Sequence, residues 1–487
     1  MKRYTIDPIT RLEGHGKIEI FCNDDGDVDN VYFQVPELRG FEKFCEGRGV
    51  EELSQIVTKI CGVCPGCHHM ASGKAADAVF GVEPPPTAKK LRELFYMAHF
   101  VHSHIAHFYA LAAPDFVVGP TAPKAERNVL GVIGKVGKEI GTEVIKQRRI
   151  AQEIQALLGG HQTHVVMNTP GGVRKGLTEE ERKDIEEKAK GFVEFGKFSL
   201  KIFNDVVLEN KTYVDIILNG PYKLDLYSMG LVDENNKVNF YDGKVRVVDQ
   251  DGKEHCKYSP DEYRDFVAER VEPWSYLKFP YLKKVGWKGF VDGKDSGVYH
   301  ATPLSRLNAS DGMATPLAQE HYEQMYATLG GKPVHHTLAM HWARLVELLY
   351  SAEHCLELAQ DPEITGDDLQ AKLDKTPTEG VGIVEAQRGT LTHHYWTDEK
   401  GIVTKANIIV GTTNNNAAIC MSLKKAAQGI IKKGVTVDDG ILNMVEMAFR
   451  AYDPCFSCAT HSLPGDMRMI VNFRNKDGEI VRSIRRD

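Results

Sequence analysis

Two Cys-x-x-Cys pairs at opposite ends of one chain constrain this sequence more than any other feature. The pairs are Cys61–Cys64 and Cys455–Cys458, in a chain of 487 residues. Four thiolates that converge on one point form a soft, electron-rich donor set for a transition metal. Because the pairs stand so far apart, the site that they predict can close only when the chain between them has folded.

A structural zinc site is the alternative to a redox or catalytic metal. The two cysteine pairs of such a zinc site usually lie roughly 15 to 20 residues apart and staple a local fold. The long spacing therefore favours a catalytic metal, although spacing alone leaves zinc open. Among the other cysteines, Cys67 is either a fifth thiol near the site or a buried residue, and we expect the rest to be small buried hydrophobic residues. These others are Cys22, Cys45, Cys256, Cys355 and Cys420.

The composition is that of a soluble globular protein with enough residues for a large core. Hydrophobic residues make up 42% and charged residues 26%, and the formal net charge of -7 argues against a nucleic-acid partner. No apolar run is long enough for a membrane span, and the N-terminus lacks the apolar stretch of a secretory signal. We therefore expect a cytoplasmic protein.

The first sixty residues are predicted to be rich in β structure. Residues 17–21 alternate in polarity, a turn signal follows at 24–27, and a second apolar stretch covers 31–33. This pattern predicts a β-hairpin. Between residues 211 and 300, turn signals and a rise in Gly, Asp, Lys and aromatic residues predict an irregular or β-containing insertion.

Helical periodicity dominates the rest of the chain. One helix is predicted to open with a capping box, in which Thr178 and Glu181 bond each other's backbone N–H groups. Several helices of roughly 20 to 35 residues favour a bundle core with β elements at its edge, so the predicted fold is mainly α, in the α+β class. The predicted helices begin near residue 86 and then cover 125–158, 178–207, 316–329, 338–358, 415–432 and 437–452.

The sequences around the cysteine pairs carry a family resemblance. The segment KICGVC that ends at Cys64, with His68 shortly after it, resembles the N-terminal metal motif of the large, catalytic subunits of nickel-iron hydrogenases. The segment DPCFSCATH that ends at His461 resembles the C-terminal one. Thr10–His15 (TRLEGH) and Arg39–Glu42 (RGFE) match two further motifs in the order of that family. The resemblance therefore spans nearly the whole chain.

The resemblance implies a nickel-iron centre in a single large-subunit domain over residues 1–461. It makes Cys61 and Cys455 terminal nickel ligands, while Cys64 and Cys458 bridge nickel to an iron that carries carbon monoxide and cyanide. Soft thiolates suit low-valent metals. The implied reaction is the reversible heterolytic cleavage of dihydrogen.

Two further residues are expected to assist this centre. By the resemblance Glu13 carries protons, because burial near a metal raises the pKa of a carboxyl group toward neutrality. His68 is expected to donate a ring N–H to a thiolate of the site. Without the family motifs, Glu13 would be interpreted as a solvated glutamate in a surface turn. His68 would be interpreted as a core histidine with its hydrogen bonds satisfied.

Arg388 is the predicted positive charge above the open metal position. Its segment, GIVEAQRG, resembles the family loop that carries this guanidinium, and Asp453 and Asp115 match carboxylates that orient it. The Pro-Asp pair at Asp115 is also common in ordinary turns. The segment VGTTN resembles the one that binds a cyanide ligand, which makes Thr412 the predicted donor.

A second metal site and a removable tail also follow from the resemblance. Glu42 and His461 match residues that hold magnesium or iron, and carboxylate oxygen suits magnesium. Family members receive nickel from a nickel chaperone and are commonly cut just after this histidine by a maturation protease. Residues 462–487 are therefore expected to be removed, although their alternating apolar residues otherwise predict a terminal strand.

Electrons are expected to leave through other polypeptides. The chain lacks a ferredoxin-type run of cysteines and a GxGxxG loop, so we expect a small hydrogenase subunit to carry the iron-sulfur clusters and another partner to hold any flavin or nicotinamide site. The motifs look most like a cytoplasmic group of methyl-viologen-reducing, deazaflavin-reducing and NAD-linked enzymes. We favour the first, with a heterodisulfide reductase and an electron-transfer subunit. A regulatory dihydrogen sensor is an alternative of another class, whereas a complex I subunit lacks the four cysteines.

Overall fold

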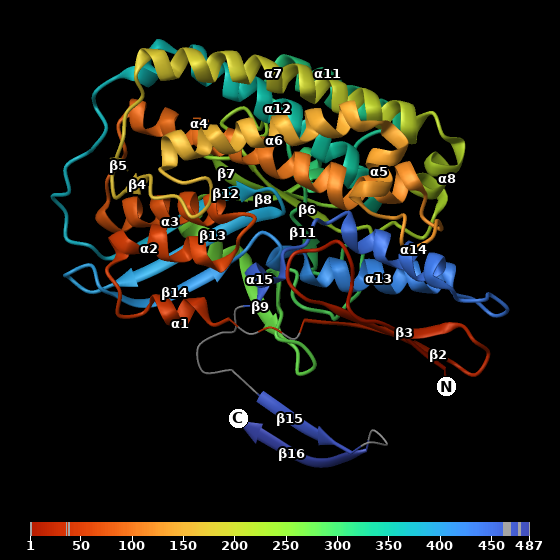
Figure 1. Ribbon diagram of the computed structural model, residues 1–487. Helices are drawn as coiled ribbons and strands as arrows, with labels where there is room; N and C mark the ends of the chain where they lie inside the picture. Colours follow the sequence, from red (N-terminus) through yellow and green to blue (C-terminus); the bar gives the residue numbers. More distant parts are fainter. Residues whose placement is uncertain (1, 36, 38, 461–468, 476–478, 487) are drawn as a thin grey trace.

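Long helices and a set of small sheets share one extended hydrophobic core. The computed structural model describes residues 2–35, 37, 39–460, 469–475 and 479–486. Figure 1 shows the long helices stacked along one side of the molecule and most of the strands and shorter helices along the other. This arrangement confirms the predicted α+β fold with a long-helix core.

The N-terminal segment forms a three-stranded antiparallel sheet. Its strands are β1 (Arg3–Ile6), β2 (Lys17–Cys22) and β3 (Val28–Gln34), paired in that order. Ile18 and Ile20 alternate with polar neighbours and are fully buried, as a strand with one face on the core requires. The predicted hairpin is therefore confirmed, and β1 adds a third strand, but the prediction of β structure over the first sixty residues is wrong beyond Gln34, because residues 41–45 and 50–60 are helical.

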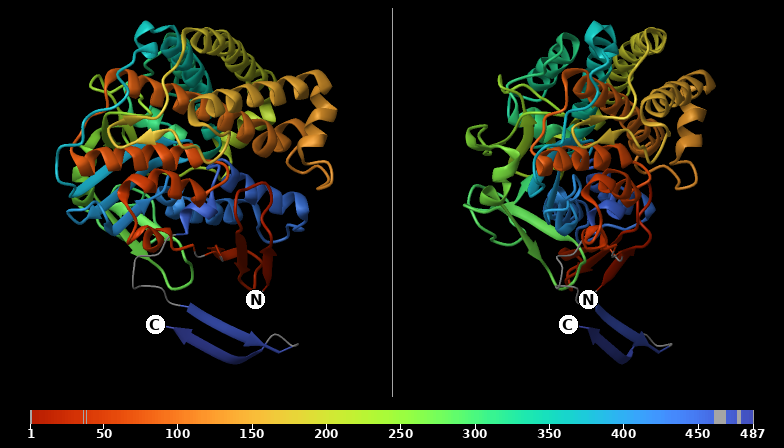
Figure 2. Two further views of the ribbon diagram at one scale, coloured as in Figure 1. Left: turned by 60° about the vertical axis from the view of Figure 1, so that its left-hand side comes forward. Right: turned by 90° about the vertical axis from the view of Figure 1, so that its left-hand side faces the viewer.

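Four long helices make up most of the bundle. Helix α12 packs against both α4 and α7, and α6 packs against α4 (Figure 2). The capping box predicted at the start of α7 is present, because Thr178 accepts from the Glu181 N–H and the Glu181 carboxylate accepts from the Thr178 N–H. The bounds of the four are α4 (Pro86–Ala106), α6 (Lys138–Gly159), α7 (Glu179–Phe203) and α12 (Met340–Gln360).

The prediction of one helix over 125–158 is wrong. The chain instead forms α5 (Val129–Val136) and then α6. Gly137 between them has φ 95° and ψ 156°, a conformation open to glycine that interrupts the helix. The Asn128 side chain caps α5 by accepting from two backbone N–H groups of its first turn. Apolar spacing continues across the break, so periodicity alone could not reveal it.

The region 211–300 holds small sheets, as predicted, but it begins with a helix. Asn210 caps this helix, α8 (Lys211–Asn219), which the composition of the region did not suggest. A four-stranded sheet follows, in the order β11-β6-β7-β8, together with the pair β9 and β10. The strands are β6 (Tyr227–Val232), β7 (Lys244–Val248), β8 (Glu254–Tyr258), β9 (Val267–Val271), β10 (Lys278–Leu282) and β11 (Tyr299–His300).

Helix α3 (Pro65–Phe80) packs directly on a three-stranded sheet of β12 (Glu379–Ala386), β13 (Gly389–Thr397) and β14 (Val403–Ile409). Glycines on β12 permit this approach. A Cβ atom on Gly382 would lie 2.1 Å from the Ala71 carbonyl oxygen, and one on Gly380 would lie 2.3 Å from Val79 N. The start of α3 and the end of β12 both lead into the cysteine cluster.

The remaining elements are short or lie near the C-terminal part of the chain. The hairpin of β15 and β16 lies apart from the body of the molecule in both views (Figures 1 and 2). Among the helices that the structure describes, none is both long and apolar enough to cross a bilayer. The other bounds are α1 (Phe41–Cys45), α2 (Val50–Ile56), α9 (Tyr263–Phe266), α10 (Pro303–Ala309), α11 (Pro316–Thr328), α13 (Asn416–Ile430), α14 (Asp439–Arg450), α15 (Phe456–Ala459), β4 (Asn168–Thr169), β5 (Gly172–Val173), β15 (Met469–Arg474) and β16 (Ile480–Arg486).

Candidate metal centre

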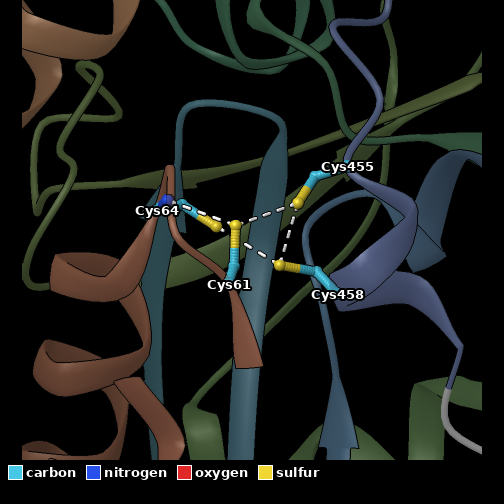
Figure 3. Close-up of side chains that lie close together, drawn as sticks. All are labelled: Cys61, Cys64, Cys455 and Cys458. Atoms are coloured by element: carbon cyan, nitrogen blue, oxygen red, sulfur yellow. Dashed lines mark hydrogen bonds between the residues drawn. The ribbon is translucent and has the colours of Figure 1, made fainter. Parts of the chain in front are cut away.

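The four predicted metal cysteines come together in one buried cluster. Their sulfur atoms all lie within 4.8 Å of one another (Figure 3). The Cys61 and Cys455 sulfurs are 3.2 Å apart, and the Cys64 and Cys458 sulfurs are 3.3 Å apart. Cys64 directly precedes α3, and Cys455 directly precedes α15. Two helix starts from opposite ends of the sequence therefore face each other.

Backbone contacts hold the N-terminal loop against the C-terminal motif. Glu13 forms a parallel bridge with Cys455, and the Phe456 N–H donates to the Glu13 carbonyl oxygen at 3.0 Å. Gly14 has φ 84°, and a Cβ atom there would lie 2.8 Å from Ser457 N. The TRLEGH motif thus needs glycine at this position to let the two segments approach.

Arg39 forms hydrogen bonds with both cysteine motifs, just before the first and just after the second. Its guanidinium donates to the Ile60 carbonyl oxygen at 2.7 Å, immediately before Cys61. Its backbone N–H donates to the Thr460 carbonyl oxygen at 3.2 Å, just beyond Cys458. The RGFE motif therefore has a structural role that the sequence did not reveal.

The clustered thiols have divergent proton affinities. Hydrogen bonds from the neighbouring thiols lower the pKa of Cys61 well below its ordinary value. Burial, together with the adjoining sulfurs, raises the pKa of Cys455 and of Cys458. Proximity thus favours the thiolate form of one cysteine and disfavours it in its neighbours. Such a cluster suits a cation, because metal ligation requires deprotonated thiols and compensates for their charge.

The carboxylate of Glu13 touches the cluster, as predicted. Its Oε2 accepts from Cys455 Sγ at 2.9 Å and from the Ser457 N–H at 3.2 Å. Burial is the main cause that raises the pKa of Glu13 above its ordinary value, and the charge of Cys61 adds to it. A partly exposed carboxyl group therefore sits within proton-transfer distance of a metal cysteine.

Arg388 lies over the same small cavity as three of the cysteines, Cys64, Cys455 and Cys458. Its Nε donates to the Asp453 carbonyl oxygen at 2.7 Å, and its Nη2 lies 3.1 Å from the Asp453 carboxylate. Burial alone would lower the pKa of Arg388, but Asp453 and the cysteine thiolates raise it well above its usual value. The structure thus places a permanent cation beside the cluster, with Asp453 as its carboxylate.

Asp115 does not lie where it was predicted. Its carboxylate accepts from Arg11 at 2.6 Å and from Arg450 at 2.8 Å, whereas the carboxylate that contacts Arg388 belongs to Asp453. Burial alone would raise the pKa of Asp115, but the two arginines hold it below its usual value. Asp115 therefore bridges Arg11 and Arg450, because it lies in a π-helical turn that faces α14 and the TRLEGH loop rather than the metal cavity.

His68 and Thr412 both contact the C-terminal cysteine motif. His68 Nε2 lies 3.4 Å from Cys458 Sγ, and burial lowers the pKa of His68 to about 4, so its ring is neutral at pH 7. The Thr412 hydroxyl oxygen accepts from the Cys455 N–H at 3.0 Å, which leaves the hydroxyl hydrogen available to a ligand. Both side chains line the metal cavity.

Glu42 is buried in a second polar site, beside an internal ammonium group. Its Oε1 accepts from Lys278 Nζ at 2.9 Å and from the Ile408 N–H at 2.8 Å, while its Oε2 has no hydrogen-bond partner among the described residues. The unpaired Oε2 of Glu42 is a suitable ligand for a hard cation. The ammonium group of Lys278, however, already compensates part of the negative charge of this carboxylate. The other predicted ligand, His461, lies outside the described residues.

Sequence reasoning left the role of Cys67 open and missed His393 and Arg344. Cys67 donates to the Gln387 side-chain oxygen at 3.0 Å and lines the metal cavity, with a pKa that burial raises. His393 contacts His68 at 3.1 Å. Arg344 lies 3.5 Å from the Asp453 carboxylate. In the sequence, only the alternation of side chains along β13 indicated that His393 could be buried. No sequence pattern distinguished Arg344 from the apolar residues around it on α12.

Comparison with known proteins supports the same assignment over almost the entire chain. The family model described as Nickel-dependent hydrogenase matches residues 39–135 and 179–461, and one described as HoxL-like matches residues 3–38. The chain is 50% identical to the F420-non-reducing hydrogenase iron-sulfur subunit of Archaeoglobus profundus, with 100% of both chains covered. It is 43% identical to a subunit of the F420-non-reducing hydrogenase of Methanothermobacter thermautotrophicus, over 99% of this chain and 100% of the relative.

A solved structure shows the same fold. The chain superposes on a subunit of an NAD+-reducing [NiFe]-hydrogenase in the H2-reduced state with a TM-score of 0.89 at 36% identity. The match covers 95% of this chain and 100% of that one, so the shared fold includes nearly every element described above.

Proposed function

The chain belongs to the nickel-dependent hydrogenase family, as the catalytic subunit of a nickel-iron hydrogenase, and we propose that Cys61, Cys64, Cys455 and Cys458 hold its metal centre. The observation that carries this proposal is the convergence of four buried sulfurs, within 4.8 Å of one another, from both ends of the sequence. When bound, the nickel-iron centre supplies the heterolytic cleavage of dihydrogen.

The four cysteines are assigned different ligand roles. Cys61 and Cys455 would hold nickel alone, whereas Cys64 and Cys458 would hold both nickel and an iron that carries carbon monoxide and cyanide. The sulfur distances do not separate the two roles, because the Cys455 and Cys458 sulfurs are 3.0 Å apart, as close as either pair across the two motifs; the division of roles rests on the family motifs. Thr412, whose oxygen accepts from the Cys455 N–H, would donate its hydroxyl hydrogen to a cyanide ligand of that iron.

Glu13 is the residue that would accept protons from the centre. A proton held on Cys455 Sγ has Glu13 Oε2 as its acceptor at 2.9 Å, and the raised pKa of Glu13 allows that carboxylate to take up and release a proton nearer neutral pH. Arg388 supplies fixed positive charge at the open side of the site, and Asp453 holds its guanidinium in place.

Infrared spectroscopy of the purified complex, combined with elemental analysis, tests the metal assignment. We expect nickel and iron together with absorption bands of metal-bound carbon monoxide and cyanide. Zinc without these bands in fully matured protein would contradict the proposal. Cys455→Ala should lose nickel and the bands, whereas Cys420→Ala, which removes a buried thiol of α13 outside the cluster, should keep both.

The electron acceptor is a further part of the proposal. The chain passes its electrons to a small subunit with iron-sulfur clusters, and the complex reduces a heterodisulfide reductase rather than a deazaflavin. The names of the relatives, F420-non-reducing hydrogenases, support the exclusion of the deazaflavin F420 as acceptor. Dihydrogen-dependent reduction of methyl viologen by the purified complex, without reduction of coenzyme F420 or NAD+, is the expected outcome.

The C-terminal tail is proposed to be temporary. A maturation protease removes residues 462–487 after nickel insertion, and Glu42 and His461 of the mature 1–461 domain then hold a magnesium or iron ion. The hairpin of β15 and β16 pairs within itself and lies apart from the body in Figure 1, which supports a removable segment. Intact-mass measurement of the matured chain should show the loss of these residues.

A further inference from the structure

Two neighbouring strands part just before they reach the metal cavity. On that side, the last backbone pair between β13 and β14 joins Thr392 to Ile409. Beyond this pair, the start of β13 leads to Arg388 and the end of β14 leads to Thr412, and both side chains line the cavity. The two groups proposed to face the metal ligands therefore stand beyond the end of the regular ladder.

The Asn415 side chain bridges the two segments beside Arg388. Its Nδ2 donates to the Arg388 carbonyl oxygen at 2.7 Å and to the Gly411 carbonyl oxygen at 3.3 Å. Its Oδ1 accepts from the Ala301 N–H at 2.7 Å. Only this orientation of the amide satisfies all three partners, because an inverted amide would turn its oxygen toward two carbonyl oxygens. The side chain is buried, so its orientation is fixed within the core.

The preceding residue, Asn414, makes a second bridge of the same kind. Its Nδ2 donates to the Thr390 carbonyl oxygen at 2.6 Å and to the Val410 carbonyl oxygen at 3.1 Å, and its Oδ1 accepts from the Tyr299 hydroxyl. Each of the two amides thus directs its two hydrogens to one carbonyl of each segment. Side-chain bonds therefore connect the segments where the backbone pairs end.

Two glycines let the bridged segments touch. A Cβ atom on Gly389 would lie 2.5 Å from the Gly411 carbonyl oxygen, and one on Gly411 would lie 2.8 Å from the Gly389 carbonyl oxygen. Since no side chain separates the two backbones, the amides of Asn414 and Asn415 act directly on the distance between them. A change in these bonds would move the backbone of Arg388 relative to that of Thr412.

We propose that Asn414 and Asn415 are positioning residues that fix Arg388 and Thr412 relative to each other across the metal cavity. This inference rests on the roles proposed above for those two side chains. Electrostatic stabilisation requires groups that are already in place before the reaction, and a displacement of about 1 Å can lower a rate by on the order of 10²-fold. The asparagines act through the backbone of the two segments.

Asn415→Ser in the matured complex is the direct test. Serine is too short to donate to both carbonyl oxygens, while the metal cysteines are unchanged. We expect nickel and iron at parental values and a shifted cyanide band, because the Thr412 hydroxyl moves relative to its proposed ligand. Dihydrogen-dependent dye reduction should fall by roughly 10- to 10²-fold. Asn414→Ser, which breaks the other bridge, should also shift the band and lower the rate.

Combination with Arg388→Lys separates positioning from a general structural effect. Substitutions at independent sites multiply their effects on a rate to within about twofold. If Asn415 acts by placing the Arg388 guanidinium, Asn415→Ser should lower the rate of the Arg388→Lys complex by less than about twofold. A further loss as large as in the parental complex would contradict the inference.

Asn308→Ser is the matched control, because the buried Asn308 side chain makes the same kinds of bond outside the site. Its Nδ2 donates to the Val334 carbonyl oxygen at 2.8 Å, and its Oδ1 accepts from the Val334 N–H at 3.1 Å. Its metal content, bands and rate should stay at parental values.

Two results in the variants of Asn414 and Asn415 would overturn the inference. One is parental bands and rates in both variants. The other is loss of nickel in both, which would assign the amides to folding of the site rather than to placement of Arg388 and Thr412. Absence of the bands from the parental complex would instead overturn the proposed metal centre, so the two failures are distinguishable.

Discussion

The carboxylate of Glu13 joins the two halves of the metal site at the scale of a single residue. It belongs to the N-terminal loop, yet it accepts hydrogen bonds from Cys455 and from the backbone of Ser457 in the C-terminal motif. A surface glutamate would keep an ordinary pKa, whereas burial raises that of Glu13. The same position therefore provides both a structural contact and a proton acceptor.

Glu13→Gln should separate these two roles. The amide keeps the size and one oxygen acceptor of the side chain but cannot take up a proton, so we expect dihydrogen-dependent dye reduction to fall by roughly 10²- to 10⁴-fold. Metal content and infrared bands should remain near parental values. Glu139→Gln, which alters an exposed carboxylate on α6, serves as the control and should retain full activity. Full activity in Glu13→Gln would exclude it as the proton carrier.

Arg388→Lys tests the fixed charge beside the cluster. Lysine keeps the positive charge but loses the planar fork that contacts both the carbonyl oxygen and the carboxylate of Asp453. We expect the rate of dihydrogen oxidation to fall by roughly 10²- to 10³-fold with nickel retained, in the range found when an oriented electrostatic donor is removed. The exposed Arg149→Lys on α6 should leave the rate unchanged.

Close packing of α3 against β12 is the decisive contact at the scale of secondary-structure elements. Gly382→Ala would place a methyl group 2.1 Å from the Ala71 carbonyl oxygen, so the helix and the strand must separate. We expect a loss of about 3 kcal/mol in the free energy of unfolding, together with reduced nickel content, because Cys64 and His68 lie at the start of α3.

Gly134→Ala on α5 is the matched control for this substitution. A Cβ atom there meets nothing within 4 Å, so the variant should be neutral or slightly stabilised, by up to about 1 kcal/mol. Denaturant unfolding of both variants provides the comparison. Equal stability of Gly382→Ala and the parent would show that α3 can shift without cost.

The contact between α4 and α12 should give the stability a pH dependence. Burial opposes protonation of His354, but hydrogen bonds with Glu357 and Glu93 raise the pKa of His354 to about 9. Because this folded-state pKa exceeds the unfolded value of 6.5, the stabilisation is complete below pH 6.5 and disappears as pH rises through 9.

His354→Gln should therefore destabilise the protein at pH 6 and have little effect at pH 10. We expect about 1 kcal/mol at the lower pH, since the histidine and its partners are partly exposed. Urea midpoints measured at the two pH values test the difference. His321→Gln on α11, where the ring bonds Gln324 rather than a carboxylate, should show no such pH dependence.

Local sequence signals predicted the elements better than their junctions. The hairpin of β2 and β3 and the capping box of α7 follow from alternation and from side-chain chemistry within a few residues. The break at Gly137 has no such signal, because the apolar spacing continues on both sides. Likewise, the motifs identified the cysteines, Glu13 and Arg388, but the placement of Asp115 depends on how α14 and the N-terminal loop pack around it.

The two ends of the chain meet at the cysteine cluster, and this closure organises the whole molecule. Cys61 and Cys64 come from the N-terminal part, Cys455 and Cys458 from the C-terminal part, and Arg39 and Glu13 reinforce the junction. Binding of a metal by all four thiolates links segments that otherwise meet through few backbone hydrogen bonds. The free energy of metal binding is therefore also free energy of folding at this junction.

Hydrogen exchange in metal-loaded and metal-free forms of the chain should detect this linkage. The metal-free form is expressed without nickel from a gene that ends at His461, so that both forms lack residues 462–487. We expect amide exchange in residues 10–16 and 453–460 to be at least about tenfold slower in the loaded form, equivalent to about 1.4 kcal/mol of local stability. Helix α7 packs on α12 through side chains away from the cysteines and should exchange equally in both forms. Equal exchange at the junction would mean that the fold preforms the site, and that the metal adds chemistry without closing the chain.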